Sequence, residues 1–268
     1  MDRKFQYALA VALTTAAIYF AEKYVDRLQE PYPDTSSVQR DHSKFDDTYL
    51  PSSTSQQVIS HGTYTLSYSE EHEQAEWVAY SLLPEHISDN RFERPYFVED
   101  RSVSTKSADW RNYKNSGYDR GHLCPAGDRR FSFDAYHETF LTSNISPQDH
   151  GFNSGIWNRL EQKVRRWAKK YNGVYVVTGG VLTENLTGIG YEGVSVPREF
   201  YKIVLAKEKD NLKAVAFLIP NASSSESYFE FAVPIDFVEA QTGIDFFPTL
   251  PEDVESPLER DLDLSFWR

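Results

Sequence analysis

The segment 119–122 carries the residue types in this chain that are best suited to chemistry, in the order Asp-Arg-Gly-His. Arg120 offers a planar donor fork that suits a pair of phosphate oxygens. His122 can act as a general base near neutral pH, provided that a neighbouring charge does not hold it protonated. Gly121 lets the backbone approach a ligand closely. A four-residue motif also occurs in ordinary surface turns, so this segment alone leaves both interpretations open.

A second segment places an amide and a carboxylate on one predicted helix. Asn153 and Glu161 are eight residues apart, which separates them by about 80° around a regular helix, and Trp157 falls between them in angle. An amide oxygen and a carboxylate on one helix face suit a hard cation such as Mg²⁺. The alternative is that Asn153 caps the helix and Glu161 is merely solvated.

With these segments the chain resembles the DNA/RNA non-specific endonucleases of the ββα-metal class. The resemblance covers roughly residues 62–251 and depends on several motifs in the same order. The matching segments are 119–122, 143–148, 153–161, 174–179, 196–197, 200–202, 219–221, 233–235 and 242–243.

The resemblance implies an α+β fold, with a central, mainly antiparallel sheet flanked by helices. It also implies an endonuclease that hydrolyses DNA and RNA with little sequence preference and uses Mg²⁺, with Mn²⁺ as an alternative ion. His122 would be the general base, Asn153 the direct metal ligand, and Glu161 the holder of metal-bound water. Arg120 would contact phosphate during catalysis. Asn144 would support the site and is counted among the substrate-binding residues.

The resemblance further implies an arginine upstream of this motif that binds the substrate and stabilises the transition state. Arg94 is the best match, with Arg91 and Arg101 as rivals. The net charge of −12 alone argues against a nucleic-acid binder. However, residues 91–172 hold 15 basic and 10 acidic residues, whereas the rest of the chain holds 13 and 30. This basic segment is compatible with a local phosphate site, although charge runs are usually solvated faces.

Length and composition indicate a globular protein with a sizeable core. The chain has 268 residues, of which 40% are hydrophobic, and this excludes a disordered or collagen-like protein. A single cysteine, Cys124, excludes an internal disulfide and is expected to be a small buried filler. Strands are expected at 63–68, 76–82, 173–178, 200–206 and 214–219, and helices at 153–171 and 236–241. Their irregular mixture indicates an α+β domain.

The N-terminus is expected to form an apolar helix. Residues 1–27 are interpreted as a membrane anchor or signal segment, because the apolar run 5–21 follows Arg3 and Lys4. The remaining segments are expected to be a polar linker at 28–59, the nuclease domain at 60–251 and an acidic surface tail at 252–268. The expected location is a membrane-anchored domain outside the cytoplasm, a secreted or periplasmic protein, or the mitochondrial intermembrane space in a eukaryote.

Two other functions remain open. One is a nuclease-like domain without activity that serves as a binding module, and the other is a phosphodiesterase for smaller phosphate esters. Inactive domains of this class typically lose the histidine or the metal-binding asparagine, and this chain keeps both. The expected partners are DNA and RNA, and the membrane through the N-terminal helix; a homodimer is also considered.

Overall fold

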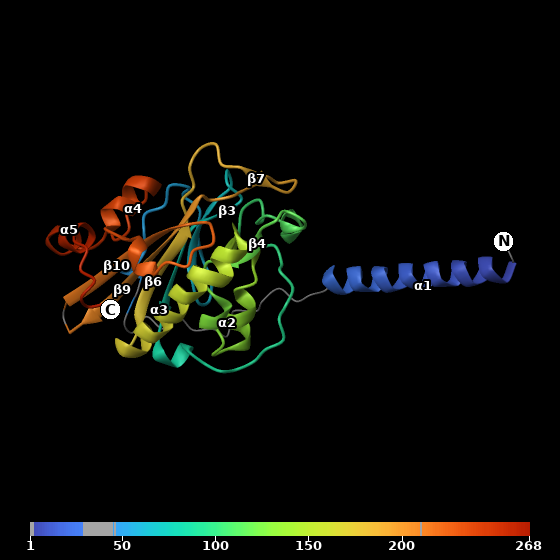
Figure 1. Cartoon of the computed structure of the whole chain (residues 1–268), viewed down its shortest axis with the longest axis horizontal. Coiled ribbons are helices and arrows are strands. Elements are labelled where there is room, and N and C mark those ends of the chain that lie inside the picture. Colours follow the sequence, from blue (N-terminus) through green and yellow to red (C-terminus); the bar gives the residue numbers. More distant parts are fainter. Residues whose placement is uncertain (1–2, 29–44, 46, 210) are drawn as a thin grey trace. The chain divides into compact units, whose positions relative to one another are not determined.

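The structure is a computed structural model that describes residues 3–28, 45, 47–209 and 211–268. The chain divides into two units, residues 1–34 and residues 35–268. The first contains helix α1 (Arg3–Leu28), and the second contains the sheet and the remaining helices (Figure 1).

Helix α1 forms where an apolar helix was expected. Within the described residues, however, no helix is both long enough and apolar enough to cross a membrane. The anchor predicted over residues 1–27 is therefore not supported. The apolar run is diluted by Gln6, Thr14 and Thr15, and charged residues follow at positions 22 and 23. The two threonine hydroxyls donate to backbone carbonyls four residues earlier in the helix.

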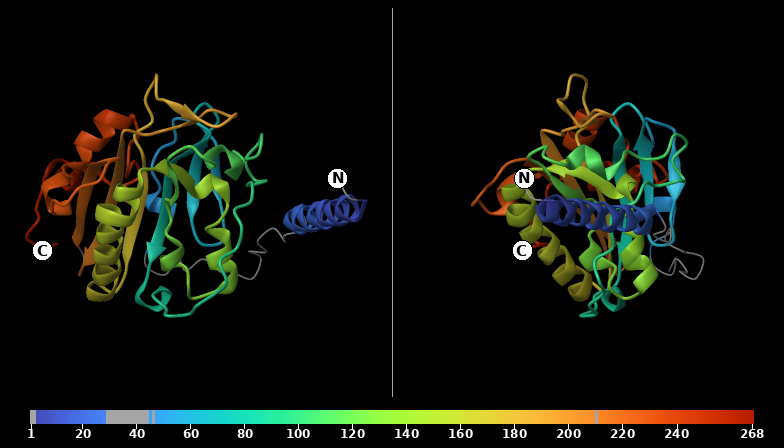
Figure 2. Two further views of the ribbon diagram at one scale, coloured as in Figure 1. Left: turned by 45° about the vertical axis from the view of Figure 1, so that its right-hand side comes forward. Right: turned by 90° about the vertical axis from the view of Figure 1, so that its right-hand side faces the viewer.

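The second unit is built on a seven-stranded sheet, counted over the described residues, whose neighbouring strands are all antiparallel (Figure 2). In spatial order the strands are β1 (Val58–Ser60), β2 (Thr65–Ser69), β3 (Gln74–Leu82), β6 (Val174–Gly180), β9 (Glu199–Glu208), β10 (Asn211–Pro220) and β11 (Ala232–Val233). Two separate two-stranded antiparallel sheets pair β4 (Asp119–His122) with β5 (Ile145–Gln148), and β7 (Gly188–Ile189) with β8 (Val194–Ser195). The predicted α+β fold with a central antiparallel sheet is confirmed.

Helices cover both faces of this sheet, and each face has its own core. The α and π helices of this unit are α2 (Phe133–Glu138), the π-helix η6 (Phe152–Trp157), α3 (Asn158–Lys170), α4 (Ile235–Thr242) and α5 (Glu252–Arg260). Short 3₁₀ helices are η1 (Asp47–Tyr49), η2 (Pro84–His86), η3 (Trp110–Tyr113), η4 (Ala126–Asp128), η5 (Thr142–Asn144) and η7 (Tyr228–Phe231). Strand β9 shows how the two cores arise, because its side chains alternate. Phe200 and Val204 pack in the core beneath α3, whereas Tyr201 and Leu205 pack in the core beneath α4.

The helix predicted over 153–171 forms, but it does not begin as a regular α-helix. Its first six residues make the π-helix η6, in which Gly155 has φ −98° and ψ −108°. The angular separation expected between Asn153 and Glu161 assumed 3.6 residues per turn throughout, so it does not apply across this kink. The predicted end of the helix is confirmed, because Asn172 and Gly173 both adopt positive φ directly after α3.

The core reaches beyond both expected limits of the domain. Phe45 and Tyr49, within the expected linker, are buried against Tyr175. The other linker residues from 29 to 44 lie outside the described residues. The segment after Pro251 was expected at the surface, yet Trp267 is fully buried beside Trp167 at a ring-centroid distance of 4.9 Å. The acidic composition of this segment gave no sign that Trp267 belongs to the core.

Candidate active site

The Asp-Arg-Gly-His segment is strand β4, and its pairing with β5 determines which way its side chains point. Gly121 lies opposite Ser146 in the antiparallel register. A Cβ atom on Gly121 would lie 2.1 Å from Cδ of Gln148, so a larger residue would collide with that side chain. Because side chains alternate along a strand, Arg120 and His122 share the other side, where both contact the Phe97 ring.

His122 lies in an aromatic pocket beside a positive charge. Its ring centroid is 5.6 Å from that of Phe97 and 5.0 Å from that of Phe140. Its Nε2 atom is buried and has no hydrogen-bond partner among the described residues. Burial, together with the charge of Arg94, lowers the pKa of His122 to about 3. The imidazole is therefore neutral at physiological pH, as a general base must be.

Two guanidinium groups lie against aromatic rings that this histidine also contacts. The Arg120 guanidinium carbon lies 5.0 Å from the Phe97 ring and 5.8 Å from the Trp110 ring. The Arg94 guanidinium carbon lies 5.6 Å from Phe97 and 5.7 Å from Phe140. Burial and the charge of Arg94 lower the pKa of Arg120. Among the ion pairs of the described residues, none joins either arginine to a carboxylate. Two such charges close together are suited to a phosphate.

The structure distinguishes the three upstream arginines. Arg94 is the one whose charge acts on both His122 and Arg120. Exposure does not separate the three, because Arg91, Arg94 and Arg101 are all exposed. The proximity favours Arg94, the match preferred from the sequence.

Asn153 is oriented by Asp119, the first residue of β4. Its Nδ2 donates to Oδ2 of Asp119 over 2.9 Å, and Nδ1 of the exposed His150 lies 2.9 Å from the same oxygen. An ionised carboxylate only accepts hydrogen bonds, so the amide nitrogen must face Asp119 and Oδ1 must point elsewhere. Nearby on β5, both amide atoms of Gln148 are buried without a partner among the described residues. These amide and carboxylate oxygens fit a hard cation such as Mg²⁺.

Glu161 belongs to a largely buried cluster of positive and negative side chains. Nη2 of Arg165 lies 3.6 Å from Oε2 of Glu161, and Nε of Arg165 pairs with Asp128. Lys202 is fully buried, with its Nζ 4.5 Å from the Trp157 ring centroid. Burial raises the pKa of Glu161 to about 7, although Lys202 and Arg165 oppose the shift. Burial lowers the pKa of Lys202 to about 8, against the attraction of Glu161. Glu161 is thus not the simply solvated side chain of the alternative interpretation.

Asn144 is a buried structural residue rather than a surface for substrate. Its Oδ1 accepts from the Cys124 backbone N–H over 2.8 Å. Its Nδ2 donates to the carbonyls of Cys124 and Thr139 over 3.0 and 2.9 Å. These bonds hold the chain directly after His122. The fully buried side chain has no surface for a direct substrate contact, and its role in supporting the site stays a prediction. Cys124 is buried as expected, and burial raises its pKa to about 12.

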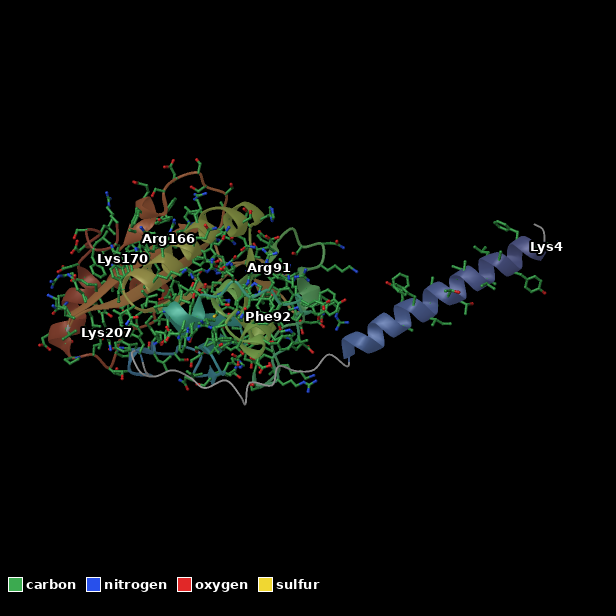
Figure 3. The ribbon with its side chains drawn as sticks, turned by 90° about the horizontal axis from the view of Figure 1, so that it is seen from below. Lys4, Arg91, Phe92, Arg166, Lys170 and Lys207 are labelled. Carbon is green, nitrogen blue, oxygen red and sulfur yellow. The ribbon has the colours of Figure 1, made fainter. Side chains whose placement is uncertain are left out.

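The basic residues of α3 do not form one free surface. Arg165 points inward to Asp128, and Arg159 donates to backbone carbonyls of Ser224 and Glu226. Arg166 and Lys170 lie along α3 and are exposed (Figure 3). Only part of the electrostatic attraction expected from this helix is therefore available to a nucleic acid.

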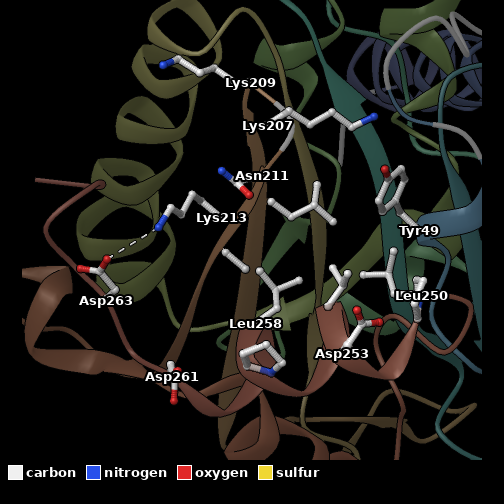
Figure 4. Close-up of a pocket in the computed structure, with 15 residues that line it drawn as sticks. Tyr49, Lys207, Lys209, Asn211, Lys213, Leu250, Asp253, Leu258, Asp261 and Asp263 are labelled. Atoms are coloured by element: carbon white, nitrogen blue, oxygen red, sulfur yellow. Dashed lines mark ion pairs between the residues drawn. The ribbon is translucent and has the colours of Figure 1, made fainter.

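A surface groove of about 790 Å³ lies elsewhere, between α5 and the β9–β10 hairpin (Figure 4). Its charged lining residues are Lys207, Lys209, Lys213, Asp253, Asp261 and Asp263. None of the candidate catalytic residues lines it. Its lysines come from the β9–β10 hairpin and its aspartates from α5 and the segment after it, and Lys213 pairs with Asp263 at 4.0 Å. This balance does not favour a polyanion.

Comparison with known proteins gives consistent matches over the second unit. Residues 41–253 match the family model described as DNA/RNA non-specific endonuclease. The chain is similar to a mitochondrial nuclease EXOG of Danio rerio, with 36% identity over 217 residues that cover 73% of this chain and 62% of the relative. It is 31% identical over 220 residues to a mitochondrial nuclease of Saccharomyces cerevisiae, covering 73% and 67%. A solved EndoG/EndoGI complex, described as giving the mechanism of EndoG inhibition, matches with 33% identity and a TM-score of 0.68, covering 74% of this chain and 88% of that one.

Proposed function

The chain belongs to the family of DNA/RNA non-specific endonucleases, and from this premise we propose that it is a Mg²⁺-dependent endonuclease for DNA and RNA. The observation that carries the proposal is the grouping of His122 with Arg94 and Arg120 in one aromatic pocket. A neutral base beside two guanidinium groups without carboxylate partners is suited to the hydrolysis of a phosphodiester. The chain spans 62% of the length of the EXOG relative. The activity of the whole relative is therefore carried over to this chain only as a proposal.

His122 supplies the base. Its Nε2 is buried without a partner among the described residues, and we propose that Nδ1 is the ring nitrogen that accepts a proton from water. The water oxygen bonds to phosphorus as its proton passes to Nδ1. The bond from phosphorus to the leaving oxygen breaks, and the leaving oxygen takes up a proton from solvent water. The low pKa of the free imidazole is set partly by Arg94. A bound phosphate neutralises that guanidinium and so makes the imidazole a stronger base in the complex.

Arg94 and Arg120 bind the phosphate and stabilise the charge that develops on it. Their guanidinium groups lie against the rings of Phe97, Phe140 and Trp110, which restrict their orientation. Preorganised donors of this kind stabilise the transition state more than the ground state. Contacts to phosphate alone carry no sequence information, so we propose little sequence preference.

The proposed cation is held by oxygen-bearing side chains of η6 and α3, the helices that follow β5. We propose Asn153 Oδ1 as the direct ligand, oriented by Asp119, with Glu161 facing the ion's water shell. When bound, Mg²⁺ or Mn²⁺ supplies positive charge to the phosphate and the leaving oxygen. Gln148, whose amide is buried without a described partner, is proposed as a further polar contact at this end of β4.

The proposed cellular location is taken from the names of the relatives. The names of the relatives from Danio rerio and Saccharomyces cerevisiae describe mitochondrial nucleases. If the chain is eukaryotic, we propose a mitochondrial location, which would separate the nuclease from the nuclear genome. Homodimer formation stays a prediction.

A substrate panel tests the proposed function. The purified chain is incubated with supercoiled plasmid, a single-stranded RNA and bis(p-nitrophenyl) phosphate, each with Mg²⁺. We expect internal cleavage of both nucleic acids at many sites, with much slower cleavage of the small ester. Turnover of the ester alone would favour a phosphodiesterase for small substrates. Binding of nucleic acid without cleavage would favour the inactive binding module.

A further inference from the structure

Helices α4 and α5 lie on the sheet face opposite α3 and bring acidic side chains together from two helices and the loop between them (Figure 1). Oxygens of Asp236, Glu239 and Glu259 lie within 4.8 Å of one another, and so do oxygens of Asp245, Glu255 and Glu259. Glu259 belongs to both groups. These five residues are named the α4–α5 carboxylate cluster.

Glu259 distinguishes this cluster from an ordinary acidic surface. The residue is only 6% exposed, and its Oε1 is buried without a hydrogen-bond partner among the described residues. The ion pairs of the described residues include none to any member of the cluster. A buried carboxylate facing other carboxylates is strongly unfavourable unless a cation or a proton offsets its charge.

The positions of the other members suit a coordinated ion. Glu239 Oε1 accepts from the backbone N–H of Phe246 over 2.9 Å, which ties α4 to the loop that carries Asp245. Asp236 and Asp245 are exposed, so water can complete a coordination shell. The loop leaves α4 through Gly243, whose φ of 71° permits the sharp turn that returns the chain toward the cluster.

We propose that the α4–α5 carboxylate cluster is a Ca²⁺ site, with Glu259 as its buried ligand. All candidate ligands are oxygens, which excludes a preference for zinc or another soft metal. Ca²⁺ binds oxygen at roughly 2.3–2.6 Å, so ligands on opposite sides of the ion are separated by about 5 Å or less. The limit of 4.8 Å observed within each group of three carboxylates meets this requirement, and Glu259 is common to both groups. Ligands from two helices and an irregular loop suit the flexible shell of Ca²⁺ better than the strict octahedron of Mg²⁺.

The consequence of binding is structural. The ion would join α4 to α5, and α5 leads into the segment that places Trp267 in the core beneath α3. Ca²⁺ would thus stabilise the attachment of the C-terminal segment. The site is independent of the proposed nuclease chemistry, because it shares no residue with the candidate active site.

The experiment compares the full chain, stripped of metal, with two variants that each lose one carboxylate. Glu259→Gln removes the buried ligand, and Glu208→Gln removes an exposed carboxylate at the end of β9. Calorimetric titration with CaCl₂ and thermal unfolding are measured for all three. Asn153→Ala is a further control. It removes the proposed ligand of the active-site cation and leaves the α4–α5 carboxylate cluster unchanged.

We expect Ca²⁺ at 100 times its Kd to raise the Tm of wild-type, Glu208→Gln and Asn153→Ala proteins by about 5 °C or more. Glu259→Gln should bind Ca²⁺ at least about tenfold more weakly, because it loses a charged ligand. Without metal this variant should be at least as stable as wild type, because a repelling charge is gone. That result separates a lost ligand from a damaged fold.

Three results would overturn the proposal. The first is a wild-type Tm that does not respond to Ca²⁺ but rises as the pH falls from 9 to 7. A proton on the Glu259 carboxylate would then offset the charge in place of a cation. The second is an equal response to Ca²⁺ in Glu259→Gln. The third is binding of Mg²⁺ as tight as that of Ca²⁺.

Discussion

The side-chain amide of Asn153 donates to the carboxylate of Asp119 over 2.9 Å. This bond joins the start of the helix after β5 to the first residue of β4. It therefore links the candidate metal ligand to the strand that carries the candidate base, three residues further along at His122. The two parts of the site cannot shift independently while this bond is made.

Removing the acceptor of this bond should weaken cation binding without removing a direct ligand. In Asp119→Ala, the Asn153 amide is free to rotate, so Oδ1 no longer points in one direction. We expect the Mg²⁺ concentration for half-maximal cleavage to rise about 10- to 100-fold, the range for residues that orient a metal ligand. Asn153→Ala should have a larger effect, and Glu161→Ala a smaller one than Asn153→Ala. Unchanged Mg²⁺ dependence in Asp119→Ala would contradict this role, with Asp134→Ala on α2 as the matched control.

Arg94 should be required for turnover, and Arg91 should not. Arg94→Ala removes one of two charges proposed to stabilise the transition state, so kcat should fall about 10²- to 10³-fold. Arg91→Ala changes the charge of the same segment equally and controls for general attraction to nucleic acid. Steady-state cleavage of a labelled oligonucleotide measures both variants. Equal losses of kcat in the two variants would show that Arg94 contributes only to the general electrostatic attraction of the nucleic acid.

His122 should remain neutral well below the pH at which an ordinary histidine titrates. Burial and the Arg94 charge lower its pKa from 6.5 to about 3 in the folded protein. The unfolded chain therefore binds a proton near pH 6.5 that the folded chain does not bind. The stability that this neutral imidazole contributes is present above pH 6.5 and declines as the pH falls from there toward 3.

An NMR titration of the His122 ring in the metal-free protein tests this directly. We expect no protonation of His122 between pH 8 and 5, while the exposed His150 serves as an internal comparison. In Arg94→Met the loss of the charge should move the pKa of His122 upward. A midpoint near 6.5 in the wild-type protein would show that the aromatic pocket does not exclude the charged form.

Lys202 should stabilise the fold through the charge of Glu161. Lys202→Met leaves the buried Asp128 and the largely buried Glu161 with less positive charge, and breaking a fully buried charged group typically costs about 3–5 kcal/mol. The double variant Lys202→Met, Glu161→Gln should recover part of this loss, because it removes a carboxylate together with the ammonium. Chemical denaturation of both variants measures the free energies of unfolding. Additive losses would exclude coupling between the two side chains.

Much of the fold could be predicted from local patterns. Strand β9 alternates its large apolar side chains between two faces, and α3 ends at Asn172 and Gly173, so both were found from the sequence. The π-helix was not, because nothing in the local composition marks Gly155 as a kink. The burial of Trp267 depends on Trp167, which is 100 residues earlier in the chain, and no local pattern reports such a contact.

The candidate site was also only partly predictable. The motif residues and Arg94 were recognised from their types and order, but their partners come from distant segments. Lys202 could have been noticed as a lysine in an otherwise apolar buried strand. Asp128 and Gln148 offered no such signal, because a single polar residue near a turn or strand end is common. Their importance appears only when β4, β5 and α3 are packed together.

The cleavage of supercoiled plasmid by wild-type and His122→Ala proteins, each with Mg²⁺ and with excess EDTA, tests the account most directly. Wild type should cut in Mg²⁺ and lose activity in EDTA. His122→Ala should be folded, as judged by its Tm, and slower by about 10²- to 10⁴-fold in Mg²⁺, the range for loss of a positioned general base. A folded His122→Ala protein that cuts at the wild-type rate, or a wild-type protein that cuts equally well in EDTA, would contradict the proposed histidine- and metal-dependent hydrolysis.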